Sequence, residues 1–174
     1  FTMWGAEILI SNTANLSVAL SRDGETLAVG NPSYFNQYHN VETGQVRVYQ
    51  KPATANAAWV LNSIIDGSVY PLWPQTGGLT GLAVAMNSSG TVIAVGAPKK
   101  QTQTGTGANA VFGPVDAGHV RVFNFDGFSW NLLGQEINGL NIDDGLGSSV
   151  SLSSDGNILA AGSGYFDNGP WDHG

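Results

Sequence analysis

The sequence contains no cysteine and very little positive charge, and each of these absences excludes a class of site. Without cysteine the chain can form no disulfide, no thiolate metal site and no cysteine nucleophile. Lys and Arg together number 6 in 174 residues, and the formal net charge is −7. A nucleic-acid-binding surface needs basic side chains to neutralise phosphates, so we expect no nucleic-acid partner. No apolar run approaches the roughly 20 residues of a membrane-spanning helix, so we expect no direct membrane insertion.

Recognisable catalytic motifs are also missing from the sequence. It has no serine nucleophile elbow, no P-loop and no dinucleotide-binding fingerprint. The histidines His39, His119 and His173 are scattered, without the close spacing of metal ligands. His119 stands beside the repeated Arg47 and Arg121 positions, and we expect it on a sheet surface. We therefore predict that the chain is not an enzyme.

What the sequence does contain is glycine, polar uncharged residues and enough apolar residues for a core. Hydrophobic residues make up 42%, charged residues only 11%, and the chain has 24 glycines. Many turns between short apolar runs are typical of an all-β protein. No apolar pattern with the period of a helix is present.

An internal repeat organises the chain. Three segments align without gaps, and they begin at Leu16, Leu82 and Ser148. Glycines recur in register 66 residues apart, and so do matching valines. These positions are Gly24, Gly90 and Gly156, then Gly30, Gly96 and Gly162, then Val18, Val84 and Val150. Repetition at this period predicts a structural unit that is used several times.

Each unit is predicted to hold four short strands. In the first unit, residues 18–20 and 27–29 alternate around Asp23-Gly24, and such a pair favours a tight hairpin turn. Residues 46–49 form the third strand, and the fourth begins at Trp59. The second unit repeats this order, with its fourth strand predicted across residues 130–137. Four antiparallel strands per repeat are typical of a β-propeller blade.

We therefore predict one all-β propeller domain with about two complete and two partial blades. Residues 1–10 would be the last strand of a preceding blade, 16–65 and 82–137 complete blades, and 148–174 the first half of another. Propellers usually close with about four to eight blades. Either the chain belongs to a larger polypeptide, or neighbouring copies complete one another.

The repeated motifs resemble the FG-GAP repeat. Leu146-Gly147 is similar to its Phe-Gly half, Gly96-Ala97-Pro98 matches its Gly-Ala-Pro half, and Gly30-Asn31-Pro32 nearly does. The closest pattern is the subclass with Ser-Val-x-Leu-Ser-x-Asp-Gly, Leu-Ala-Val-Gly-Ala-Pro, Gly-x-Val-Arg-Val-Tyr and then Trp. FG-GAP repeats build the propeller of integrin α subunits and of many secreted proteins. The resemblance implies a propeller in an extracellular or cell-surface protein.

The resemblance suggests calcium as a possible cofactor, but the sequence departs from the calcium-binding form of the repeat. Calcium-binding FG-GAP repeats carry several acidic residues in the loop before the Gly-Ala-Pro strand, because the ion needs about six to eight oxygen ligands. Here that loop is reduced to a tight turn with one carboxylate at most, as in Asp23-Gly24. We expect no cofactor. Asp143 and Asp144 are weak alternative metal candidates, and solvated turn carboxylates are the favoured interpretation.

Loops on one face of the propeller are the predicted place for binding. The second-to-third-strand loops and the connectors between blades share that face and vary in length, as binding loops on a rigid scaffold do. They carry aromatic residues suited to stacking on sugars or to a protein interface, and equally to packing over the blades. The candidates are Tyr34, Phe35, Tyr38, Tyr70, Trp73, Phe112, Tyr165, Phe166 and Trp171.

Two sequons, at Asn15 and Asn87, are glycosylation candidates, and Asn87 is expected to be exposed at a hairpin tip. The first functional hypothesis is a non-catalytic structural or adhesion module that assembles with other blades of its polypeptide or with neighbouring copies. The alternatives are a glycan-binding propeller that uses the aromatic loop face, and a non-catalytic part of a larger secreted enzyme.

Overall fold

A computed structural model describes residues 8, 10, 15–38, 40–54, 57–67, 78–101, 103–104 and 111–164. These residues are all β-strand, turn and loop, which confirms the predicted all-β class. The strands are β1 Ser17–Leu20, β2 Thr26–Asn31, β3 Phe35–Asn36, β4 Val41–Glu42, β5 Gln45–Gln50, β6 Val60–Asp66, β7 Ala83–Met86, β8 Val92–Ala97, β9 Gln103–Thr104, β10 Val111–Phe112, β11 His119–Phe125, β12 Trp130–Leu132, β13 Ile137–Asn138, β14 Leu146–Leu152 and β15 Leu159–Ser163.

The first repeat unit folds as an antiparallel four-stranded sheet in the order β1-β2-β5-β6. Val18 lies opposite Val29, and Val29 lies opposite Arg47, so the repeated motifs occupy adjacent strands. β-Branched side chains suit this pleated, half-buried surface. We refer to this unit as sheet 1.

The second unit, sheet 2, repeats this arrangement with one difference in its last strand. Its order is β12-β11-β8-β7, and β13 also pairs with β11. The expected continuous strand over residues 130–137 is wrong, because Leu133 to Glu136 separate β12 from β13. Gly134 has a φ of +76° there, a conformation that cannot continue a strand. The third unit, sheet 3, contributes the antiparallel pair β14-β15.

The three hairpin turns share one side-chain hydrogen bond. Ser21 Oγ accepts from Thr26 N at 2.9 Å, and Ser153 Oγ accepts from Ile158 N at 2.9 Å. In sheet 2 the same position is Asn87, whose Oδ1 accepts from Val92 N at 2.9 Å. A side-chain oxygen one residue after the first strand therefore fixes the turn in every unit.

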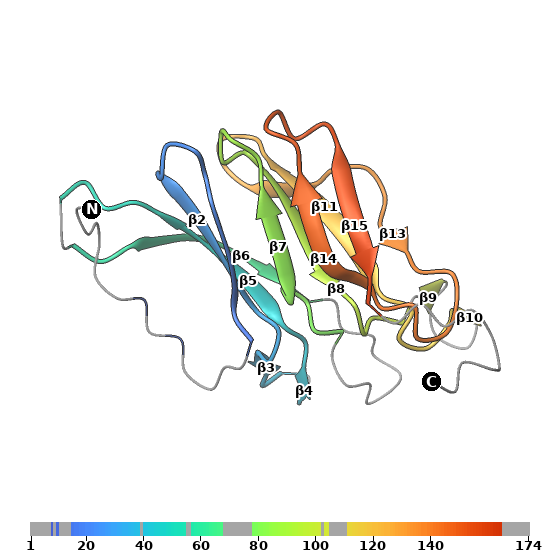
Figure 1. Cartoon of the computed structure of the whole chain (residues 1–174). Helices are drawn as coiled ribbons and strands as arrows, with labels where there is room; N and C mark the ends of the chain where they lie inside the picture. The colour runs from blue at the N-terminus through green and yellow to red at the C-terminus, as the bar shows by residue number, and fades with distance from the viewer. Residues whose placement is uncertain are drawn as a thin grey trace.

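The sheets pack face to face and enclose the core between them. Ala28, Val46, Val48 and Ile65 of sheet 1 form one buried cluster with Ile93, Val95 and Phe123 of sheet 2. Figure 1 shows the sheets side by side, with the turns that join β1–β2, β7–β8 and β14–β15 at one edge. The small hairpins β3–β4 and β9–β10, which the sequence did not predict, lie at the opposite edge (Figure 1). The described strands do not close into a ring.

Glycines allow the sheets to approach closely. A Cβ added to Gly30 would fall on the carbonyl oxygen of Gly81, and one added to Gly96 would fall on that of Gly147. The backbone of each new unit therefore rests directly on the second strand of the unit before it. The repeated glycines that revealed the units in the sequence are the points of contact between the sheets.

Candidate functional site

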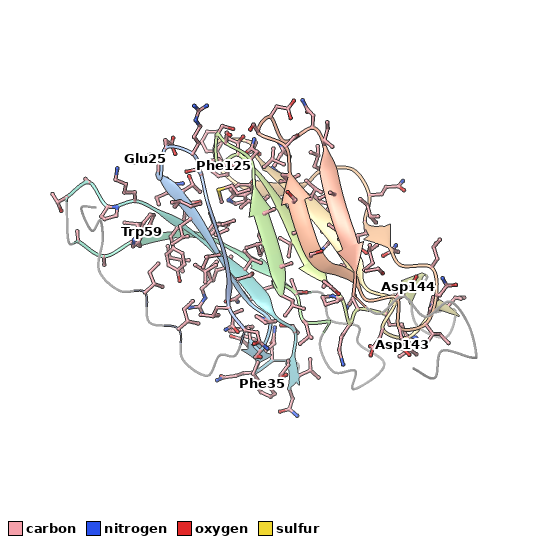
Figure 2. The ribbon with its side chains drawn as sticks, in the orientation of Figure 1. Glu25, Phe35, Trp59, Phe125, Asp143 and Asp144 are labelled. Atoms are coloured by element: carbon pink, nitrogen blue, oxygen red, sulfur yellow. The ribbon has the colours of Figure 1, made fainter. Side chains whose placement is uncertain are left out.

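The predicted binding loops lie at the edge of the molecule opposite the hairpin turns. Figure 2 places Glu25 at the hairpin edge, and Phe35 and Asp143 at the opposite edge, which we call the loop edge. Phe35 follows the second strand of sheet 1, whereas Asp143 belongs to the connector before sheet 3. A second-to-third-strand loop and a connector between units therefore lie at the same edge, as expected, at these two residues.

The aromatic candidates whose side chains the structure describes lie in or beside the β3–β4 hairpin, between β2 and β5. Phe35 is exposed, Tyr34 is half-buried, and Tyr38 is 97% exposed. Phe112 lies in β10, and its side chain is outside the described part of the chain. The other candidates also lie outside the described residues: Tyr70, Trp73, Tyr165, Phe166 and Trp171. An aromatic binding face therefore stays a prediction.

A cavity of about 460 Å³ opens between the loops of sheets 2 and 3. Its apolar wall comes from Leu79, Leu82 and Pro98, and its charged groups are Lys99, Asp116 and Asp143. Gly145 and Ser148 complete the lining. Asp116 and Asp143 have positive φ angles of 49° and 62°, so both carboxylates stand on tight turns. The cavity can take a small ligand with one apolar side and several hydroxyl or charged groups.

The two adjacent acids of the connector do different things. Asp144 is buried, and its Oδ2 accepts from Asn141 N at 2.8 Å and Leu140 N at 2.9 Å. These bonds, with that of the Asn141 backbone the largest influence, hold the pKa of Asp144 below its usual value. Asp143 is exposed and lines the cavity. No group of three or more His, Cys, Asp or Glu residues that could hold a metal occurs in the part of the chain that the structure describes.

The two sequons differ in accessibility. Asn15 is exposed and has a φ of +59°. Asn87 is only 3% exposed, and its Oδ1 accepts from Thr91 N and Val92 N. The expected exposure of the Asn87 amide is therefore wrong, because its side chain folds back to stabilise the turn. Use of either sequon stays a prediction.

A buried basic cluster at the junction of sheets 1 and 2 was not foreseen. His119 is fully buried, which corrects the expected sheet-surface position, and neither ring nitrogen has a hydrogen-bond partner. Burial, with Arg121 and then Lys100 nearby, lowers the pKa of His119 to about 3. Burial also lowers the pKa of Lys100 to about 8. Arg121 Nη2 donates to Asp66 O of sheet 1 at 3.1 Å.

Glu136 lies beside this cluster without forming an ion pair with His119. Its Oε2 is 3.8 Å from Nδ1 of His119. Because the pKa of His119 is about 3, the ring is neutral at pH 7. Two features explain the burial of His119: the alternating pattern of β11 and the packing of sheet 1 on that strand. The sequence alone shows only the alternating pattern.

The outer faces of the first and last sheets have no other sheet of the described residues against them. On β1, Val18 is 67% exposed and Leu20 is exposed. Val84 and Met86, the residues 66 positions later, pack against the buried core between sheets 1 and 2. At the other end Ser149, Ser151 and Ala160 are exposed, and Ile158 is 69% exposed. We call the first surface the large face and the second the small face.

The described part of the chain contains no helix of a length and hydrophobicity that could span a bilayer. The resemblance to FG-GAP repeats rests on the repeated motifs alone. A scan against protein-family models found no match, and a search of curated proteins found none either.

Proposed function

We propose that this chain is a non-catalytic structural module that works by protein–protein assembly at a cell surface or in an extracellular filament. Its sheets would be blades of an FG-GAP-like propeller, and its partners would be other blades or neighbouring copies. The observation that carries this proposal is the exposure of Val18 and Leu20 at positions whose counterparts, Val84 and Met86, are packed against a core. Exposed apolar side chains gathered on one face are typical of a protein interaction surface.

The chemistry of the large face supports a protein partner. Val18 and Leu20 alternate with Ser17 and Ala19, which point toward sheet 2, so β1 presents only apolar side chains outward. Burial of a Val or Leu side chain contributes roughly 1.5–3 kcal/mol, and two such residues on a rigid strand make a substantial anchor. A rigid strand also loses little conformational entropy on binding.

The test is association of the purified chain in solution, measured by sedimentation velocity over a wide concentration range. We expect the wild-type chain to associate and Val18→Glu to abolish this association. Val111→Glu is the matched control, because Val111 is a valine of similar exposure, 65%, on β10 at the loop edge. Association that survives Val18→Glu unchanged, or that is lost equally in Val111→Glu, would contradict the proposal.

The cavity at the loop edge supports the second candidate, glycan binding. Leu79, Leu82 and Pro98 offer an apolar wall, and Asp116 and Asp143 offer acceptors for sugar hydroxyls. A glycan array with the wild-type chain tests this function. We expect binding to be lost in Asp143→Asn if the cavity holds the sugar, and silence across the array counts against this candidate.

A further inference from the structure

The contact between consecutive sheets is built twice from the same positions. The face of sheet 1 that meets sheet 2 carries Ser17, Ala19, Ala28 and Gly30, and the matching face of sheet 2 carries Ala83, Ala85, Ala94 and Gly96. On these first two strands each face carries only small residues, and it receives the larger side chains of the following unit. The small face of sheet 3, with Ser149, Ser151, Ala160 and Gly162, is the third member of this series.

Hairpin turns supply the first row of repeated contacts. The side chain of Thr26 lies against Gly90 of the following turn, and that of Val92 lies against Gly156. Ile158 occupies the position of Thr26 and Val92 in the third unit, and it is 69% exposed. The counterpart of the two glycines is Gly24, and a Cβ there would meet nothing within 4 Å. Ile158 and Gly24 would continue this row of contacts. Each is uncovered, and the two lie in the last and the first sheet of the chain.

Backbone groups at the same turns supply a second row. Arg22 N donates to Ser88 O at 3.0 Å, and Ser88 N donates to Ser154 O at 2.9 Å. Residues 22, 88 and 154 are equivalent in the repeat. The row has a direction, because each unit donates to the next. Continuing it would bring the Ser154 N–H of one chain to the Arg22 carbonyl of another.

A third row runs along the other end of the strands. Gly81 and Gly147 lie against Gly30 and Gly96 of the preceding sheets, with φ angles of +87° and +94°. The equivalent residue before β1 is Asn15, and its φ is also positive, at +59°. Asn15 therefore already has the backbone conformation that the other two use at a junction. Asparagine is among the few residues other than glycine that adopt it readily.

We propose that a second copy of this chain docks its large face on the small face of the first, in the same geometry as the two junctions inside the chain. Ile158 of one copy packs against Gly24 of the second copy, and Gly162 receives the Asn15 backbone of the second copy. The contact is heterologous, so it joins copies head to tail. This inference rests on the proposed function and names the partner and its orientation.

Continuity with the internal junctions favours this occupant over an unrelated protein. A partner must present side chains of the size of Val84 and Met86 to the small face, and Val18 and Leu20 are those side chains on another copy. The partner must also present an acceptor to the Ser154 N–H, and the carbonyl of Arg22 on another copy is such an acceptor. The two faces of one chain meet both requirements.

Two blocked variants test the orientation. Val18→Glu with Leu20→Glu blocks the large face, and Ser151→Glu with Ala160→Glu blocks the small face. All four positions are exposed, and the added charges have the same sign, so blocked faces do not attract each other. Light scattering and sedimentation velocity give the mass of each variant alone and of their equimolar mixture, with circular dichroism as the check on folding.

We expect each variant alone to be monomeric and the mixture to form a one-to-one complex with twice the mass of the chain. Self-association of the variant whose large face is open would overturn the inference, because like faces would then pair; the proposed function would survive. A mixture that stays monomeric while the wild type associates overturns the inference in the same way. Association of the wild type that neither blocked variant reduces would overturn both.

Gly162→Ala provides the residue-level test. Within one chain a Cβ at Gly162 meets the hydroxyl of Ser149 alone at close range, and that side chain can rotate away. We expect folding to be unchanged and the complex with the large-face-open variant to weaken at least tenfold. Equal affinity for wild type and Gly162→Ala would show that the second copy does not approach as sheet 3 approaches sheet 2.

Discussion

Gln45 and His119 occupy the same position in sheets 1 and 2, and only Gln45 forms side-chain hydrogen bonds there. Gln45 Nε2 donates to Asp66 Oδ1 at 2.7 Å, and its Oε1 accepts from Arg47 Nε at 2.8 Å. His119 is equally buried, and both of its ring nitrogens lack a partner. Sheet 2 therefore carries an unmet polar group at a place where sheet 1 has a complete network.

This difference predicts that His119→Gln stabilises the protein. A glutamine would supply the donor and the acceptor that Gln45 supplies in sheet 1, and it would end the cost of a buried, unpaired ring. We expect the free energy of unfolding to rise by about 1 kcal/mol, measured by urea denaturation. The reverse substitution, Gln45→His, is the control and should destabilise by a similar amount or more. A loss of stability in His119→Gln would contradict the comparison.

His119 also predicts a pH dependence in a defined window. Its folded pKa, about 3, lies below the unfolded value of 6.5, so the unfolded chain takes up the proton first. The stability from the neutral ring is therefore present above pH 6.5 and is lost as pH falls toward 3, by on the order of 1 kcal/mol per pH unit. The window lies mostly above the usual carboxylate pKa of 3.8. Urea midpoints between pH 7 and 4 should fall in the wild type and be nearly flat in His119→Gln.

Gly96→Ala tests the close approach of the sheets. The added methyl group would meet the carbonyl oxygen of Gly147, a backbone atom that cannot move without separating the sheets. We expect a loss of about 3 kcal/mol, the upper end of overpacking costs, measured by thermal and urea unfolding. Gly162→Ala is the equivalent change in sheet 3 and should have little effect on the monomer. Equal effects of the two substitutions would contradict the stacking.

Asn87→Ala separates the structural use of Asn87 from its sequon. Loss of the bonds that Asn87 Oδ1 accepts from Thr91 N and Val92 N should destabilise the fold by about 2 kcal/mol. Ser89→Ala also removes the sequon. Ser89 Oγ accepts from Asn87 Nδ2 at 3.0 Å, but because Ser89 is exposed we expect a loss of at most about 1 kcal/mol. Expression in a glycosylating host, followed by mass spectrometry of the wild type beside either variant, shows whether the sequon is used at all.

Asp144→Ala and Asp143→Ala distinguish a structural acid from a cavity acid. Asp144 caps the backbone of Leu140 and Asn141, so its loss should lower the melting temperature clearly. Asp143 makes no comparable bond through its carboxylate in the described structure, so its substitution should lower the melting temperature much less, by the strain of alanine at a φ of +62° alone. The pKa of Asp144 is lowered, so its contribution is present above the usual carboxylate pKa of 3.8 and is lost as the pH falls below it. A melting temperature that falls equally in both variants would contradict this assignment.

The all-β class could be predicted from the sequence because its signals are local. Asp23-Gly24 sets a turn, alternation sets the strands beside it, and the spacing between Gly24 and Gly90 reveals the repeat. The predicted strand at residues 46–49 is β5, Gln45–Gln50, and the predicted fourth strand at Trp59 is β6, which begins at Val60.

Features that depend on neighbouring sheets could not be predicted in the same way. The burial of His119 needs sheet 1 against β11, and the burial of the Asn87 amide needs the turn of sheet 3, whose Gly156 lies beside it. The break between β12 and β13 depends on the φ of Gly134. The alignment of residues 130–137 with residues 59–65 gives no sign of this break. The prediction of an aromatic loop face rests on which residues the loops contain, and no local pattern in the sequence indicates where their side chains lie.

The row of hydrogen bonds from Arg22 to Ser88 to Ser154 has an evolutionary consequence. Because every junction uses the same positions, loss or duplication of one 66-residue unit joins a small face to a large face again and leaves no mismatched junction. The number of units can thus change by recombination within the gene, while each retained junction keeps its residues. The stability of such an array is then close to a sum over its units and junctions, so a change in the number of units leaves the variable loops of each unit in place.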